Sequence, residues 1–233
     1  MSNDAREWIC GTREQRPTGV ETKGLVDKKR LWKAGQELLI GFIGGSKALQ
    51  DRVFKSACHW IDASGGGANL VFKQVDQAGD AHVRVSFVAD EGSWSNIGQD
   101  ALAVPKDEAT MNLGWVAEGT PEKDFRSVVL HEFGHALGLL HEHNHPELDL
   151  RWKKDVVYAD LGSPPNNWSR DDVDFNVFEQ YPKSRVLMSS NPDLRSIMIY
   201  TIPARWLDGQ PAITPSSTLS MGDKTFIRSV YPY

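Results

Sequence analysis

The chain has 233 residues, of which 40% are hydrophobic and eight are tryptophan, enough for a folded core in one large domain or two small lobes. Its formal net charge of −5, with no basic stripe beyond residues 27–30, argues against nucleic-acid binding. No apolar run is long enough for a membrane span or, at the start of the chain, for a signal peptide.

The first half of the chain predicts strands around one helix. Residues 1 to about 30 are polar and without periodicity, and we expect them to be extended. Glycines end both the first strand and the first helix, and the 82–89 segment alternates clearly between apolar and polar residues. In chain order, the expected elements are a strand at 37–45, a helix at 46–67, strands at 69–76 and 82–89, a loop or sheet edge at 92–98 and a strand at 109–116.

A second long helix is predicted to follow, with Thr120 as its N-cap and Pro121 at its first helical position. Beyond Glu147 the spacing becomes irregular and rich in proline turns, until residues 218–232 predict a last helix capped at Ser220. This order favours an α+β upper lobe and an irregular lower lobe. The second helix should bury Val129, Phe133, Ala136, Leu137 and Leu140.

Five of the seven histidines lie within residues 128–147. His131 and His135 are four residues apart, so on a helix both imidazoles can reach one ion at about 2.0–2.1 Å, the distance that zinc prefers. Gly138 can adopt the left-handed conformation that ends a helix, and the chain then returns His141 to the same ion. Three neutral ligands leave a fourth position for water, which is typical of a catalytic zinc site.

Glu132 follows the first of these histidines and is placed to contact the water rather than the metal. The pattern H-E-x-x-H-x-x-G-x-x-H fixes five positions on a predicted helix and is the metzincin signature. A structural or vestigial metal site and a coincidence are the alternatives. The spacing of His143 and His145 does not predict that either residue binds the ion. We therefore predict that they lie at the surface or contact the ligands from behind.

The motif and further segments resemble the astacin-like zinc endopeptidases, within the metzincins, and above all their cysteine-poor bacterial and fungal members. The resemblance covers most of residues 31–233. It implies an α+β zincin fold, with an upper lobe of twisted mixed sheet and two long helices at about 24–141, an irregular lower lobe with the C-terminal helix at about 142–233, and an active-site cleft between them. The matching segments are Leu31–Trp32, GSWSNIG at 92–98, HEFGHALGLLHEH at 131–143, DVDFNVFEQY at 172–181, SIMIY at 196–200 and LSMGDKTFIRSVYP at 219–232.

The resemblance also implies a role for each matching residue of the zinc site. His131, His135 and His141 match the ligands of one catalytic zinc ion, and Glu132 matches the general base and acid. Tyr200 matches a tyrosine that contacts zinc at rest and then stabilises the tetrahedral intermediate.

Three further matches concern the surroundings of the site. Met198 matches the methionine whose turn lies beneath the metal, and Glu142 matches the glutamate that receives the new N-terminus after a prosegment is removed. The rim strand that pairs with an extended substrate is matched by Trp94, Ser95, Asn96 and Ile97.

The chain departs from the family pattern in three respects. Ile199 stands where the family usually has histidine, and Leu139 where it usually has phenylalanine. The cysteines of the family's internal disulfides are missing. The aspartate by which the family's prosegment blocks the zinc site is not evident in residues 1 to about 30, which instead contain Cys10.

Cys10 is followed by glycine and lies 13 positions before Lys23. A trypsin-like activating protease that cuts after Lys23 would leave Gly24 as the new N-terminus, which defines an expected prosegment at 1–23 and a catalytic domain at 24–233. A thiolate is a strong zinc ligand, so we predict that Cys10 occupies the position of the water in a latent form, as the cysteine of matrix-metalloprotease prosegments does. A disulfide with Cys58 and an idle thiol are the alternatives.

The predicted function is therefore zinc-dependent hydrolysis of internal peptide bonds, in a chain present as a latent proenzyme. The alternatives are another zinc hydrolase, such as an exopeptidase or a narrowly targeted effector protease, and a zinc-binding module without turnover. We expect the substrates to be proteins or peptides in extended conformation and the partners to include an activating protease, but no nucleic acid or membrane. We also expect a monomer that is secreted from the cell.

Overall fold

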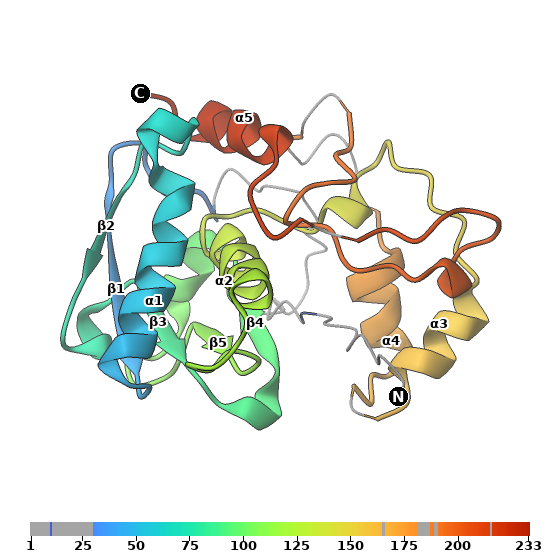
Figure 1. Ribbon diagram of the computed structural model, residues 1–233, viewed down its shortest axis with the longest axis horizontal. Coiled ribbons are helices and arrows are strands. Elements are labelled where there is room, and N and C mark those ends of the chain that lie inside the picture. Colours follow the sequence, from blue (N-terminus) through green and yellow to red (C-terminus); the bar gives the residue numbers. More distant parts are fainter. Residues whose placement is uncertain (1–9, 11–29, 165, 181–186, 189–190, 215) are drawn as a thin grey trace.

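The structure is a computed structural model, and it describes residues 10, 30–164, 166–180, 187–188, 191–214 and 216–233 (Figure 1). The strands are β1 (Glu37–Ile43), β2 (Val71–Gln74), β3 (Val83–Ser86), β4 (Ser93–Ser95) and β5 (Met111–Leu113). The α-helices are α1 (Lys47–Ala57), α2 (Glu122–Ala136), α3 (Lys154–Leu161), α4 (Arg170–Val173) and α5 (Met221–Val230), and η8 (Asp174–Phe178) is a π-helix. Short 3-10 helices are η2 (Cys58–Ile61), η3 (Ala63–Gly65), η4 (Ala78–Asp80), η5 (Ala89–Glu91), η6 (Gly98–Ala103), η7 (Glu142–Asn144) and η10 (Ala204–Trp206).

The five strands form one mixed sheet in the order β2-β1-β3-β5-β4. All neighbours are parallel except β4, which runs antiparallel to β5 and lies at the edge of the sheet. The helices α1 and α2 pack against each other, and both lie on the side of the sheet that faces the viewer in Figure 1. The predicted mixed sheet with two long helices is confirmed, and residues 92–98 contain its edge strand.

The first core joins the sheet to α1, α2 and α5. Two buried indoles satisfy their N–H groups within this apolar core, since Trp60 Nε1 donates to the Leu130 carbonyl and Trp32 Nε1 to the Ala136 carbonyl, each at 2.8 Å. The helix α5, drawn in red at the top of Figure 1, adds Ile227 to this core, although we expected the last helix with the second half of the chain.

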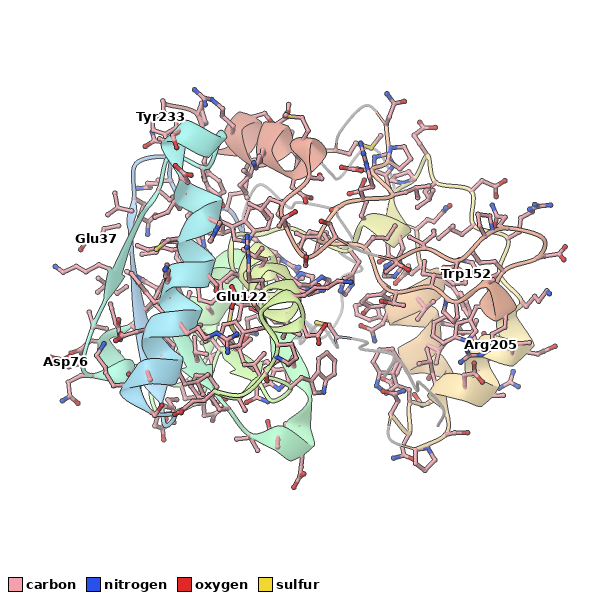
Figure 2. All side chains as sticks on the ribbon, viewed as in Figure 1. Glu37, Asp76, Glu122, Trp152, Arg205 and Tyr233 are labelled. Carbon is pink, nitrogen blue, oxygen red and sulfur yellow. The ribbon has the colours of Figure 1, made fainter. Side chains whose placement is uncertain are left out.

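A second core holds together the half of the chain that the sequence left irregular. Its buried members come from α3, α4, η8 and the loops around them, among them Val157, Leu161, Val177 and Trp206. In Figure 2 the labels Trp152 and Arg205 mark this half, and Glu37 and Asp76 mark the half that contains the sheet. The helix α3 was not predicted, because an eight-residue helix with two buried residues leaves little periodicity to find.

Helix boundaries differ from the sequence expectations at two places. The helix α1 ends at Ala57 and the chain continues in 3-10 turns, so the regular helix stops well before the glycines at 65–67. Pro121, not Thr120, is the N-cap of α2, because the Thr120 hydroxyl accepts the Ala117 N–H at 2.9 Å instead of capping the helix. Within the described residues, no helix has the length and apolar character needed to cross a membrane.

Candidate metal centre

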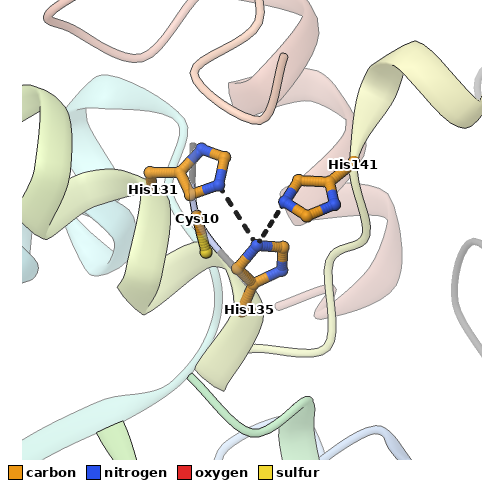
Figure 3. Close-up of side chains that lie close together, drawn as sticks. All are labelled: Cys10, His131, His135 and His141. Atoms are coloured by element: carbon orange, nitrogen blue, oxygen red, sulfur yellow. Dashed lines mark hydrogen bonds between the residues drawn. The ribbon is translucent and has the colours of Figure 1, made fainter. Parts of the chain in front are cut away.

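The helix α2 places two histidines side by side at its C-terminal end. Both side chains are buried, and His131 Nε2 lies 3.2 Å from His135 Nε2 (Figure 3). Each ring is oriented through its other nitrogen: His131 Nδ1 lies 2.8 Å from the Ile197 carbonyl oxygen, and His135 Nδ1 lies 2.8 Å from that of Leu139. Because a carbonyl only accepts, both Nδ1 atoms carry the proton.

A left-handed turn brings the third histidine to the same point. Gly138 has φ +93°, as predicted, and ends the helix two residues after Ala136. The chain then reverses, and His141 Nε2 lies 3.0 Å from His135 Nε2. Figure 3 shows the three rings converging from α2 and from the segment that follows it.

This donor set suits a cation. In neutral His131 and His135 the Nε2 atoms are bare lone pairs, and two lone pairs 3.2 Å apart repel each other unless a positive ion lies between them. Burial lowers the pKa of His131 to about 4 and holds the pKa values of His135 and His141 well below their usual range, so the three rings are neutral. Three neutral imidazoles from an i, i+4 pair and a following turn are ligands that zinc prefers.

Met198 packs closely against α2 at Gly134. A Cβ atom on Gly134 would lie 2.3 Å from Met198 Sδ, so the helix can pass over the methionine only because residue 134 has no side chain. Asp223 fixes the turn before the methionine: it accepts hydrogen bonds from the Ser196 hydroxyl at 2.6 Å and from the Ile197 N–H at 2.9 Å.

Glu132 and Cys10 meet beside the three imidazoles. The Cys10 thiol donates to Glu132 Oε2 at 3.3 Å, and the ligand atoms of Cys10, His131, His135 and His141 all lie within 4.8 Å of one another. Burial raises the pKa of Glu132 to about 8, although the hydrogen bond from Cys10 acts in the opposite direction. Burial, and then the charge of Glu132, raise the pKa of the Cys10 thiol well above its usual value.

Tyr200 also contacts Cys10. Its side chain is buried, and its hydroxyl donates to the Cys10 backbone carbonyl. Cys10 and Cys58 are both free thiols, and Cys58 is half-buried at the start of η2, so the alternative of a disulfide between them is wrong.

Glu142 lines a separate cavity next to the centre. The cavity has a volume of about 70 Å³ and is also lined by Asp193 and Asp223. Glu142 Oε1 accepts the Asp193 N–H at 2.8 Å, and burial raises the pKa of Glu142 to about 7. Lys23 and Gly24, where we predict the activating cut, lie outside the described residues.

The two remaining histidines of the run are not at the surface, so that part of the prediction is wrong. His143 is 2% exposed and His145 is 1% exposed. His143 Nε2 lies 2.9 Å from the Asn176 carbonyl oxygen, and His145 Nδ1 accepts the Glu147 N–H at 3.1 Å. Packing against Asn176 and the Trp152 ring of the second half, which the sequence did not predict, buries His143.

The predicted substrate-binding residues lie on or directly after the edge strand β4, which contacts α2. Trp94 and Ser95 belong to the strand, Asn96 and Ile97 follow it, and none of the four is more than 5% exposed. The structure therefore brings the rim residues close to the helix of the metal ligands, but buries them.

Sequence analysis missed Asp223 and the contact between His143 and Tyr200. Asp223 had a signal, because Ser220 and Asp223 form an S-x-x-D capping box at the start of α5, and this carboxylate also reaches the turn before Met198. The ring centroids of His143 and Tyr200 lie 4.2 Å apart although the two residues are distant in the chain, and no sequence pattern predicts such a pair.

Comparisons with known proteins agree with this geometry. The profile of the peptidase family Astacin matches residues 27–229. The chain is 28% identical over 223 residues to the zinc metalloproteinase dpy-31 of Caenorhabditis elegans and 27% identical over 221 residues to dpy-31 of Teladorsagia circumcincta, covering 92% and 91% of this chain. It spans about a third of the length of these relatives, 34% and 33%.

Solved structures of myroilysin share the fold. One has a TM-score of 0.83 and 38% identity over 89% of this chain and 98% of its own. A second has a TM-score of 0.72 and 34% identity over 100% of this chain and 94% of its own. The similarity therefore extends over the sheet, the helices and the second core together.

Proposed function

Because the chain belongs to the astacin family of metallopeptidases, we propose that it is a zinc-dependent endopeptidase whose full-length form is latent. The observation that carries the activity is the convergence of three neutral imidazoles beside the buried carboxyl group of Glu132. In this proposal His131, His135 and His141 hold one zinc ion, and Glu132 remains free for proton transfer.

The chemistry divides between the ion and the side chains. When bound by the three neutral histidines, zinc would supply a Lewis acid for water and for a peptide carbonyl. Glu132 takes a proton from the attacking water and passes it to the leaving amine, and the burial that raises its pKa favours retention of the proton between the two transfers. The Tyr200 hydroxyl donates a hydrogen bond to the oxyanion that develops on the substrate carbonyl.

The substrate in this proposal is an extended segment of a protein. Among the described strands, β4 pairs with β5 alone, so its other edge can add a strand of substrate, with Trp94, Ser95, Asn96 and Ile97 beside it. Main-chain pairing would bind many sequences, and the side chains around the cleft would select among them.

Hydrolysis of unfolded casein tests the activity. The activated chain should cleave casein at internal bonds, lose this activity when 1,10-phenanthroline removes zinc, and regain it when zinc is restored. Release of single terminal residues alone would favour an exopeptidase, and zinc binding without cleavage would favour a binding module. Either result would contradict the proposed endopeptidase activity.

Latency is proposed from the contacts of Cys10. Its thiol donates to Glu132 and its carbonyl accepts from Tyr200, so one residue engages both proposed catalytic groups. The sulfur lies among the imidazole nitrogens, where zinc would lower the pKa of the thiol enough to bind it as a thiolate. The burial of the rim residues also fits a closed form, because a strand that binds substrate must become accessible.

Cys10→Ala should raise the casein-cleaving activity of the full-length chain by about tenfold or more, because loss of a thiolate ligand frees the fourth position of the metal. Cys58→Ala is the matched control, since Cys58 is a free thiol in the first half of the chain, and it should leave activity unchanged. The measurement is initial rate per bound zinc. Equal rates for the wild-type and Cys10→Ala chains would exclude latency through Cys10.

Activation in this proposal also uses the cavity beside Glu142. A cut after Lys23 would create an amine at Gly24, and the three carboxyl groups of Glu142, Asp193 and Asp223 form an acidic environment that suits an ammonium group. The expected prosegment is therefore 1–23 and the catalytic domain 24–233.

A further inference from the structure

The ring of Tyr200 lies against two imidazoles. The ring centroids of Tyr200 and His141 are 4.3 Å apart, with the ring planes at 53°. Those of Tyr200 and His143 are 4.2 Å apart, with the planes closer to parallel at 30°. His141 is one of the three converging imidazoles, whereas His143 is not among the residues whose ligand atoms meet there.

His143 is held mainly by the second core, although its ring also lies beside that of His141, with centroids 5.1 Å apart and the planes at 26°. Its Nε2 atom donates to the Asn176 carbonyl oxygen at 2.9 Å, and Asn176 belongs to the π-helix η8 of the second core. The Trp152 ring approaches His143 with centroids 6.5 Å apart and an interplanar angle of 83°. A buried ring held by a hydrogen bond and by an aromatic neighbour has little freedom to tilt.

A purely structural role explains this residue poorly. Within the described residues, His143 Nδ1 is buried and has no hydrogen-bond partner. A buried acceptor without a partner is destabilising, and an apolar ring would fill the same space without that loss. The feature that the imidazole adds is the hydrogen bond to η8, which sets the position of its face against Tyr200.

We propose that His143 is a positioning residue for Tyr200. The His143 ring stacks on the Tyr200 ring and is itself fixed by its hydrogen bond to η8, so it keeps Tyr200 in place beside the metal centre. This inference rests on the role of Tyr200 in the proposed function. A hydroxyl that stabilises a developing oxyanion must be in place before the charge forms, because reorientation during the reaction would raise the barrier. A flat neighbouring face restrains tilting of the phenol ring but permits movement along the face.

The kinetic test uses the full-length chain with Cys10→Ala as background, a fluorogenic peptide, and zinc content as a second readout. We expect His143→Ala to lower kcat by about tenfold with KM changed less than about twofold, and to retain zinc. His143→Phe keeps a ring in the stack but loses the hydrogen bond to η8, so it should recover only part of the lost kcat. Tyr200→Phe should lower kcat by about 10²-fold, as expected for a lost oxyanion donor.

The double variant decides between positioning and an unrelated effect. If His143 acts through Tyr200, adding His143→Ala to Tyr200→Phe should lower kcat no further. Multiplying effects would show that His143 acts elsewhere and would overturn the inference. A wild-type kcat for Tyr200→Phe would refute the role of Tyr200 and this inference together, while zinc-dependent casein cleavage would still support the endopeptidase.

A readout without catalysis comes from Cys10. Because the Tyr200 hydroxyl donates to the Cys10 carbonyl, a less restrained Tyr200 should release Cys10 more often. In a full-length chain with Cys58→Ala, 5,5′-dithiobis(2-nitrobenzoic acid) should label Cys10 several-fold faster in the His143→Ala variant than in the parent, and at an intermediate rate in His143→Phe, which keeps the ring but loses the hydrogen bond to η8. Equal labelling in all three chains would contradict the inference.

Discussion

Replacement of His141 by alanine is expected to remove the zinc ion and to reduce casein cleavage to background. His141 supplies one of three converging nitrogens, and two imidazoles at i and i+4 cannot hold the ion with the affinity of three. The same result is expected for His131→Ala and His135→Ala. The measurement is zinc per chain after gel filtration, together with cleavage rate and melting temperature.

The matched controls lie in the same short run of sequence. His143→Ala and His145→Ala remove equally buried imidazoles that are not among the converging ligands, so both variants should keep close to one zinc per chain. We expect some loss of stability in both controls from the cavity that each creates. Loss of zinc from His143→Ala but not from His141→Ala would show that the ligands have been assigned wrongly.

Glu132→Gln should retain zinc and fold but lose about 10²–10⁴-fold in kcat, the usual loss when a general base is removed. Glutamine keeps the size and hydrogen-bonding shape of the side chain, so the difference isolates proton transfer. Zinc content and kcat are both measured in the Cys10→Ala background, because in the parent chain Cys10 also contacts Glu132.

Glu122→Gln is the control for this change. Glu122 lies at the start of the same helix with its side chain 64% exposed and pairs with Arg52 at the surface, so its loss should leave kcat unchanged. A wild-type kcat in Glu132→Gln would refute the proposed proton transfer. Loss of zinc from Glu132→Gln would instead place the carboxylate among the ligands.

The metal centre was the most predictable part of the molecule because its geometry is local. An i, i+4 pair on a helix, a glycine that must turn left and a third histidine three residues later leave few alternative arrangements, and the structure brings the three rings together. The mixed sheet was predictable for a related reason, since its strands are short apolar segments with clear ends.

The second half of the chain was less predictable because distant contacts define it. The helix α3 buries only Val157 and Leu161, and those residues are recognised as core only when Trp206 and its neighbours pack on them. The burial of His143 beside Asn176 and Trp152 follows from packing in the same half of the chain. Residue spacing within a short window carries no information about such contacts.

Tyr231 illustrates what distant contacts mean for the newly made chain. Its hydroxyl donates to the Leu137 carbonyl, at the end of the histidine-bearing helix, at 2.7 Å across 94 positions. At about 5–20 residues per second, a ribosome needs roughly 5–20 s to travel from one residue to the other. During that interval the end of the helix lacks its partner and the apolar surface that α5 later covers stays open. During this interval the uncovered apolar surface is open to aggregation and to chaperones, and the hydrogen bond from Tyr231 to the end of the helix forms only after residue 231 has emerged.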